Sequence, residues 1–152
     1  MFPLNQSQAY CARLFLDDYK ACRNHFREII RTKKQLESRH EIFSNSVNNL
    51  DYDCDAFYLG KQDARKVMVF ISGTHGIEGF CGSAIQRYLL TEIFPTLESN
   101  DDCAFLFIHA LNPWGMANYR RCDELGIDLN RNFIDFNLVF ISNIEHYYFL
   151  CF

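Results

Sequence analysis

Two groups of polar residues have the types and the spacing expected of a catalytic site. In the first group, His75 and Glu78 are three positions apart within a glycine-rich segment, residues 73–79. Residues at this spacing are neighbours where a chain enters a helix, so the imidazole and the carboxylate could face one point. Both groups are good zinc ligands at roughly 2.0–2.2 Å. The spacing by itself is also compatible with two ordinary surface residues.

The second group contains Asn130 and Arg131, which follow Asp128 and are preceded by Arg120 and Arg121. The planar guanidinium of Arg131 matches a carboxylate through two parallel hydrogen bonds, and Asn130 adds a neutral donor. Arg120 or Arg121 could stabilise an oxyanion. The alternative is a polar loop in which the arginines pair with acidic residues of the same segment.

The first group directly follows a predicted buried strand. Residues 67–72 and residues 104–109 are continuous apolar runs, and residues 83–94 between them have helical spacing. An order of strand, loop, helix and strand predicts a βαβ unit with a parallel pair of strands. Functional groups in such sheets gather beyond the carboxyl ends of the strands, which is where His75 lies and where residues 110–115 follow the second strand.

The amino-terminal third of the chain offers elements without obvious chemistry. Residues 12–29 carry apolar side chains at steps of three and four, which predicts an amphipathic helix with Ser7 as a possible cap. Residues 44–55 are rich in Asn, Ser and Asp, which favours turns. Residues 56–59 could form a short strand.

Composition limits the protein class. A length of 152 residues, with 49% apolar residues, suffices for one domain with a core. The net charge of -4 gives no reason to expect a nucleic acid or an anionic membrane as partner, and no apolar run reaches the ~20 residues of a membrane span. Seven cysteines, an odd number without a CxxC pair, and no secretory signal predict reduced thiols and a cytoplasmic location.

Taken together, the two polar groups resemble the zinc carboxypeptidase family through residues 73–79 and 128–133. Residues 72–86 and 109–115 are similar to one poorly characterised branch of that family, a domain of unknown function. The likeness runs from about Tyr10 to Phe133. It implies an α/β fold of three layers, α/β/α, around a mixed and partly parallel sheet, of which this chain would supply only the amino-terminal portion.

The resemblance also implies a role for each matching residue. His75 and Glu78 would be two ligands of a Zn²⁺ cofactor, which polarises a carbonyl group and activates a water molecule. Asn130 and Arg131 would hold the terminal carboxylate of the substrate. Arg121 would polarise the scissile carbonyl, with Arg120 as the alternative register. His109, although it ends a strand, is expected to be structural.

The ligand set is expected to be incomplete. Family members supply a third zinc ligand, a histidine, and a general-base glutamate downstream, whereas residues 134–152 do not resemble that continuation. This segment holds one histidine, His146, next to one glutamate, Glu145, and adjacent side chains point in different directions. We therefore expect residues 1–152 to form a single partial domain with an atypical apolar tail at 134–152. Its unfinished sheet edge predicts poor solubility or self-association.

Three functions are compatible with these motifs. The first is a zinc hydrolase of carboxypeptidase type, impaired in this chain, that acts on peptide or amide bonds near a free carboxylate. The second is a zinc amidohydrolase that removes the acyl group from an N-acyl amino acid. The third is a non-catalytic remnant or a binding module.

Overall fold

The computed structural model describes residues 9, 12–33, 38–47, 50–96 and 102–132. Four strands form one sheet: β1 (Ser38–Val47), β2 (Leu50–Leu59), β3 (Lys66–Ile71) and β4 (Cys103–His109). The main helices are α2 (Tyr19–Arg31) and α3 (Gly79–Tyr88), and α3 continues into a π-helical turn, Leu89–Ile93, and a 3-10 turn, Phe94–Thr96. A short helix, α4 (Pro113–Ala117), and a 3-10 turn, Leu129–Arg131, follow β4.

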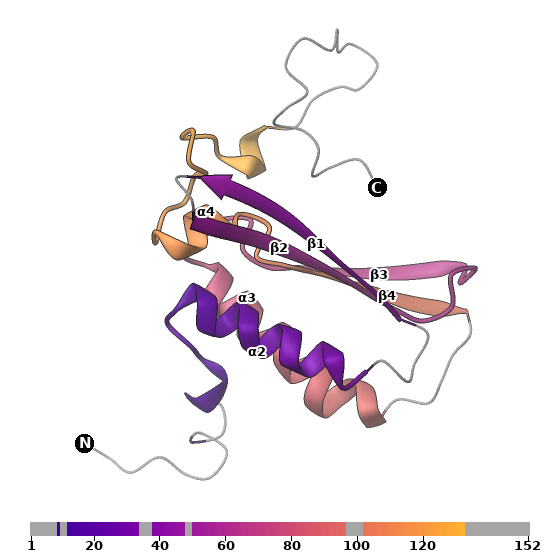
Figure 1. Cartoon of the computed structure of the whole chain (residues 1–152). Helices are drawn as coiled ribbons and strands as arrows, with labels where there is room; N and C mark the ends of the chain where they lie inside the picture. The colour runs from indigo at the N-terminus through magenta and orange to yellow at the C-terminus, as the bar shows by residue number, and fades with distance from the viewer. Residues whose placement is uncertain (1–8, 10–11, 34–37, 48–49, 97–101, 133–152) are drawn as a thin grey trace, which may run out of the picture.

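The sheet is mixed and partly parallel, which confirms the predicted α/β class (Figure 1). The strand order is β1-β2-β4-β3. β3 and β4 are parallel and are connected through α3, as the βαβ pattern predicts, whereas β2 is antiparallel to both of its neighbours. The carboxyl ends of β3 and β4 therefore meet at one edge of the sheet.

The turn-rich interpretation of residues 44–55 is wrong. β1 and β2 are each ten residues long, and they pair in antiparallel register from Ser38 opposite Leu59 to Val47 opposite Leu50. The preference of Asn, Ser and Asp for turns is local and weak, and strand formation depends on the neighbours that a side chain meets. Here β2 lies between two strands, and its acidic residues meet arginines of α2.

Helix α2 begins later than predicted. Asp18 caps it, since its side chain accepts a hydrogen bond from the backbone N–H of Ala21 at 2.7 Å. The predicted cap, Ser7, lies outside the described residues. The predicted apolar face is confirmed from Tyr19 onward, whereas Phe15 precedes the helix and is exposed. The buried side chains of α2 recur at helical spacing: Tyr19, Cys22, Phe26, Ile29 and Ile30.

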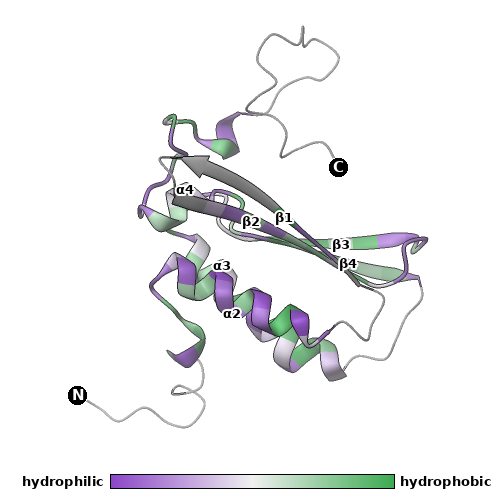
Figure 2. Ribbon diagram, viewed as in Figure 1, coloured by the Kyte–Doolittle hydropathy of each residue, from purple (hydrophilic) through white to green (hydrophobic). Residues whose placement is uncertain are grey.

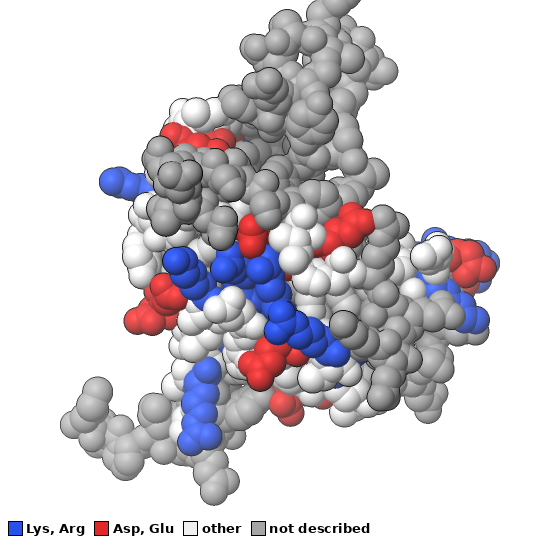
Figure 3. Space-filling model, viewed as in Figure 1, with Lys and Arg blue, Asp and Glu red and all other residues white. Residues whose placement is uncertain are grey.

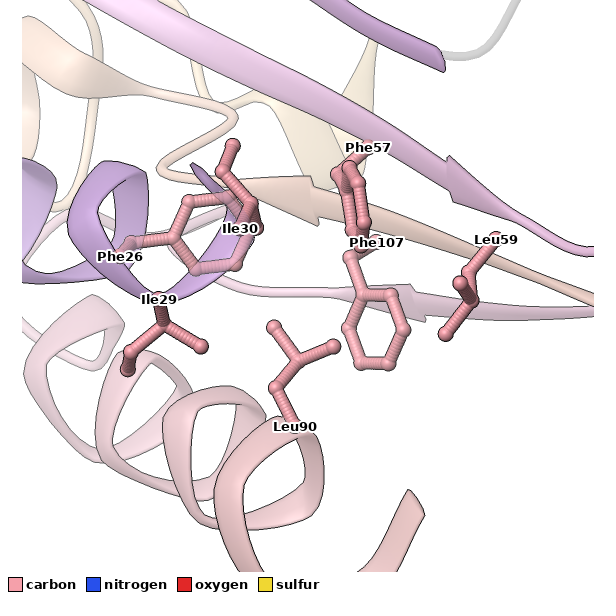
Figure 4. Packing of buried hydrophobic residues seen from close by; sticks show 7 residues of the cluster. All are labelled: Phe26, Ile29, Ile30, Phe57, Leu59, Leu90 and Phe107. Atoms are coloured by element: carbon pink, nitrogen blue, oxygen red, sulfur yellow. The ribbon is translucent and has the colours of Figure 1, made fainter. Parts of the chain in front are cut away.

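The main core lies between the helices and one face of the sheet (Figures 1 and 4). It is formed by Phe26, Ile29, Ile30, Phe57, Leu59, Leu90 and Phe107. Because α2 and α3 both cover this face, the described residues form two of the three expected layers. Within the described ranges, no helix has the length and apolar character needed to cross a lipid bilayer.

Ion pairs fix α2 to the β1–β2 hairpin. Arg27 donates to Asp53 and to Asp55, both at 2.8 Å, and Arg23 donates to Asp53 at 3.0 Å. Asp55 is fully buried and also contacts the Nε2 atom of His40 at 2.6 Å. Figure 3 shows basic side chains gathered over α2 next to acidic groups. Much of the positive charge of α2 is therefore balanced within the fold.

The other face of the sheet carries exposed apolar side chains on β3. Val67, Val69 and Ile71 alternate along the strand, so they lie on one face, and about half of each side chain is exposed. Figure 2 shows the hydrophobic colouring of this strand. Among the described strands, β3 pairs only with β4, so its outer edge is open. Self-association through this edge stays a prediction.

We expect Val69→Lys to reduce concentration-dependent association of the chain. The side chain is 48% exposed, so a charge there should change the free energy of unfolding by less than about 0.5 kcal/mol while opposing apolar contact between copies. Sedimentation velocity over a range of protein concentrations measures the effect. Ile42→Lys is the matched control, because Ile42 has the same exposure on the opposite edge strand. A wild-type chain that stays monomeric at every concentration would contradict this expectation.

Candidate metal site

The segment that follows β3 is held against the segment that follows β4. Leu111 donates its backbone N–H to the carbonyl of Ser72, and Asn112 donates to the carbonyl of Gly73, both at 2.8 Å. Gly73 has a φ of +72°, a conformation that favours glycine. These bonds place His75 at the carboxyl end of β3, as predicted.

Gly76 brings the loop into direct contact with α4. A Cβ atom on this residue would lie 1.9 Å from the carbonyl carbon of Gly115 and 2.2 Å from the backbone nitrogen of Met116. Both positions are far inside van der Waals contact and belong to backbone, which cannot rotate away. The loop that carries His75 therefore requires glycine at this position because of close packing.

His75 and Glu78 are brought together as their spacing predicts. The Nδ1 atom of His75 lies 3.3 Å from the Oε2 atom of Glu78, and the imidazole is 9% exposed. Two ligands at roughly 2.1 Å from one tetrahedral zinc ion are about 3.4 Å apart. The observed separation therefore fits a pair of ligands that share one zinc ion.

Asp128 is the site residue that sequence reasoning did not assign. Its Oδ1 atom lies 3.0 Å from the Nε2 atom of His75, on the side of the ring away from Glu78. Asp128 also caps the 3-10 turn Leu129–Arg131, since the same Oδ1 accepts the backbone N–H of Asn130 at 3.0 Å. An Asp two residues before Asn-Arg was visible in the sequence, but the 53-residue separation from His75 hid the contact.

The surroundings of Asp128 keep it ionised. Desolvation acts to raise the pKa of this carboxyl group, but hydrogen bonds from Arg121, from the backbone of Asn130 and from His75 outweigh it and lower the pKa below its usual value. Arg121 contributes through its Nε atom, 2.9 Å from Oδ2 of Asp128. The carboxylate can therefore only accept hydrogen bonds, so the Nε2 atom of His75 must donate.

A proton on Nε2 of His75 also determines the state of the other ring nitrogen, Nδ1. In neutral imidazole one nitrogen donates and the other carries a lone pair, so a proton on Nε2 of His75 leaves the Nδ1 lone pair facing the Glu78 carboxylate. Two electron-rich atoms at 3.3 Å repel unless a proton or a metal cation lies between them. In metal sites, a histidine ligand usually donates its other ring N–H to a carboxylate, a backbone carbonyl or a water molecule.

The side chains expected to bind substrate make no hydrogen bond to His75, Glu78 or Asp128 within the described residues, although the backbone of Asn130 donates to Asp128. Asn130 and Arg131 are both exposed, and the Arg131 guanidinium donates to the Asn130 carbonyl at 2.9 Å. Arg121 reaches the centre only through Asp128. Arg120 is exposed and makes no ion pair or side-chain hydrogen bond with the described part of the chain. The choice between Arg120 and Arg121 as the carbonyl-polarising residue stays open.

The described residues bring two of the predicted zinc ligands, His75 and Glu78, within 3.3 Å of each other. Within the described ranges, no group of three His, Cys, Asp or Glu side chains is placed to hold a metal ion. His75 and Glu78 fit a zinc ion by their separation and donor types, and Asp128 fits as the residue that orients His75. Glu145 and His146, which are not expected to replace the missing ligand and general base, lie outside the described residues.

His109 is not part of this site. It is fully buried, its Nε2 atom lies 2.8 Å from the hydroxyl oxygen of Ser83, and its ring stacks on Phe26 with centroids 4.5 Å apart. These contacts agree with the structural role predicted for it. Burial lowers the pKa of His109 to about 3.

The buried imidazole should make folding sensitive to acid. In the unfolded chain the pKa of His109 has its ordinary value of 6.5, whereas burial lowers it to about 3 in the folded chain. Above pH 6.5 the imidazole is neutral in both states, so it does not make the free energy of unfolding depend on pH. Below pH 6.5 the unfolded chain binds the proton more readily, and the free energy of unfolding falls by up to about 1.4 kcal/mol per pH unit. Denaturant unfolding from pH 7.5 to 4.5 should show this slope reduced in His109→Gln. Equal slopes in both proteins would disprove the assignment.

Comparison with known proteins places the chain in a family. The family model described as protein of unknown function (DUF2817) matches residues 15–148. The match includes both polar groups and extends through most of the apolar segment at 134–152. No curated protein sequence matches the chain. Since the family model spans most of its length, the chain belongs to the DUF2817 family.

Proposed function

We propose that this protein is of the zinc-dependent hydrolase type represented by carboxypeptidases, which acts on peptide or amide bonds near a free carboxylate, and that its activity is impaired in this chain. One observation carries the proposal. His75 and Glu78 are separated by the distance that one zinc ion would require, and Asp128 holds the opposite nitrogen of His75. The sequence resemblance to zinc carboxypeptidases supports the same assignment.

Each residue has a distinct task in this proposal. When bound, zinc supplies a Lewis acid for the scissile carbonyl and lowers the pKa of a water molecule. Asp128 keeps the proton of His75 on Nε2, so that Nδ1 is free to bind metal. Arg131 and Asn130 receive the terminal carboxylate of the substrate. Arg121 or Arg120 stabilises the oxyanion that forms on the carbonyl.

The expected substrate is a peptide or an N-acyl amino acid. The arginines near Asp128 in the sequence, Arg121 and Arg131, suit a substrate that carries a negative charge next to the bond that is cleaved. We also propose a cytoplasmic location, with no nucleic acid and no membrane as partner. The described cysteines are unpaired, which is compatible with a reducing compartment: Cys22, Cys54, Cys81, Cys103 and Cys122.

Cleavage of matched peptides tests the proposal. The zinc-loaded protein should release the last residue from a peptide with a free carboxyl end and should leave the amidated peptide intact. Arg131→Gln should reduce cleavage of the free peptide by about 10- to 100-fold, the effect of losing a charge-assisted hydrogen bond. Arg65→Gln is the control, because Arg65 pairs with Asp102 and takes no part in the site.

The other outcomes separate the alternatives. Hydrolysis of N-acyl amino acids without peptide cleavage would identify an amidohydrolase. Equal cleavage of free and amidated peptides would rule out the carboxylate clamp. A protein that binds zinc but hydrolyses neither class would be a non-catalytic binding module.

A further inference from the structure

Asn112 connects the three segments that build the site. It is 2% exposed and follows β4 by three residues. Its side-chain Oδ1 accepts the backbone N–H of Gly115 at 2.8 Å, which caps α4, and its Nδ2 donates to the carbonyl of Arg121 at 3.4 Å. Its backbone N–H donates to the carbonyl of Gly73 at 2.8 Å, at the start of the His75 loop.

The first turn of α4 contacts both the segment that carries Arg120 and Arg121 and the His75 loop. The carbonyl of Gly115 accepts the backbone N–H of Arg120 at 2.8 Å. The same residue packs so closely against Gly76 that no side-chain atom fits between them. The segment that carries Arg120 and Arg121 is thus joined to the His75 loop through α4, and Asn112 makes hydrogen bonds to each part.

We propose that Asn112 is a positioning residue of the site. By fixing the backbone of Arg121, it fixes the guanidinium that binds Asp128, and Asp128 in turn orients His75. Asn112 does not touch the metal position or the substrate-binding residues, so its effect on them is indirect. The role in metal binding rests on the proposed function, whereas the effect on the His75–Asp128 contact does not.

The chemistry of the side chain explains why an amide suits this position. The Gly115 N–H needs an acceptor and the Arg121 carbonyl needs a donor, and an asparagine side chain supplies both from one planar group. Aspartate has the same shape and keeps the acceptor. It would, however, direct a carboxylate oxygen at the Arg121 carbonyl, where two acceptors repel.

The variant Asn112→Asp therefore tests positioning without removing the cap of α4. Nuclear magnetic resonance of the metal-free chain can follow the proton on Nε2 of His75, which Asp128 protects from exchange with water. We expect this proton to exchange roughly tenfold faster in Asn112→Asp, as for the loss of one hydrogen bond, and at least as fast in Asn112→Ala. Asn118→Ala is the matched control, because Asn118 caps the carboxyl end of α4 and its side chain donates to the carbonyl of Trp114.

Two results would overturn the inference. One is an exchange rate in Asn112→Asp equal to that of the wild type. The other is an equal acceleration in Asn118→Ala, which would mean that any loosening of α4 has the same effect. Cobalt titration of the same proteins then separates this inference from the proposed function. If even the wild type fails to bind cobalt, the metal site is wrong, but the exchange result still decides the role of Asn112.

Discussion

Replacing Asp128 with alanine should weaken zinc binding by about 10- to 100-fold. This is the usual effect of losing a carboxylate that accepts the N–H of a metal-binding histidine. The carboxylate accepts the Nε2 proton of His75 at 3.0 Å and so keeps the Nδ1 lone pair directed at the metal position. Without it the imidazole can rotate and can exchange its tautomer. Competition between the protein and a chromophoric chelator measures the zinc affinity directly.

Asp102→Ala is the matched control for this experiment. It removes the same charge, but its partner is the exposed Arg65 beyond the far end of β3. Exposed ion pairs of this kind contribute little to stability, so zinc affinity should be unchanged. Asp128→Asn should give an intermediate loss, because the amide keeps an acceptor but loses the charge. Equal affinities of Asp128→Ala and the wild type would exclude Asp128 from the site.

Replacing Gly76 with alanine should destabilise the fold by about 3 kcal/mol or more, at the upper end for an overpacked position. The added Cβ would lie 1.9 Å from a backbone atom of Gly115, so either the His75 loop or α4 must move. Chemical denaturation monitored through Trp114 measures the change, since this tryptophan is part of α4.

Gly126→Ala distinguishes crowding from backbone strain. Gly126 has a φ of +81° but has open space around the position of a Cβ atom, so its replacement should cost only about 1–2 kcal/mol. At Gly76, by contrast, a Cβ atom would be crowded by the backbone of α4, whereas the backbone conformation is not left-handed. If Gly76→Ala proves no more destabilising than Gly126→Ala, this result would contradict the close packing of the His75 loop against α4.

The βαβ half of the molecule was predictable from the sequence. The two apolar runs at 67–72 and 104–109 became β3 and β4, and their parallel pairing followed from the helix between them. The position of His75 and Glu78 at a strand end also followed, because parallel strands place their carboxyl ends at one edge of the sheet. These features depend on local patterns and on general rules of chain connection.

The hairpin and the partner of His75 were not predictable in the same way. β1 and β2 contain residues that favour turns in isolation, and their strand conformation depends on pairing and on ion pairs between Asp53 or Asp55 and α2. The contact between His75 and Asp128 joins segments that are far apart in the chain. The packing of α4 against Gly76 and the hydrogen bonds of Asn112 and Gly115 bring these segments together.

Zinc stoichiometry tests the central claim most directly. At equilibrium with free zinc, the chain should bind up to one equivalent per molecule, and both His75→Ala and Glu78→Gln should lose this binding. His40→Ala should keep it, since His40 contacts Asp55 at the hairpin. An unchanged zinc content in His75→Ala, with the protein still folded, would contradict a metal site at this loop.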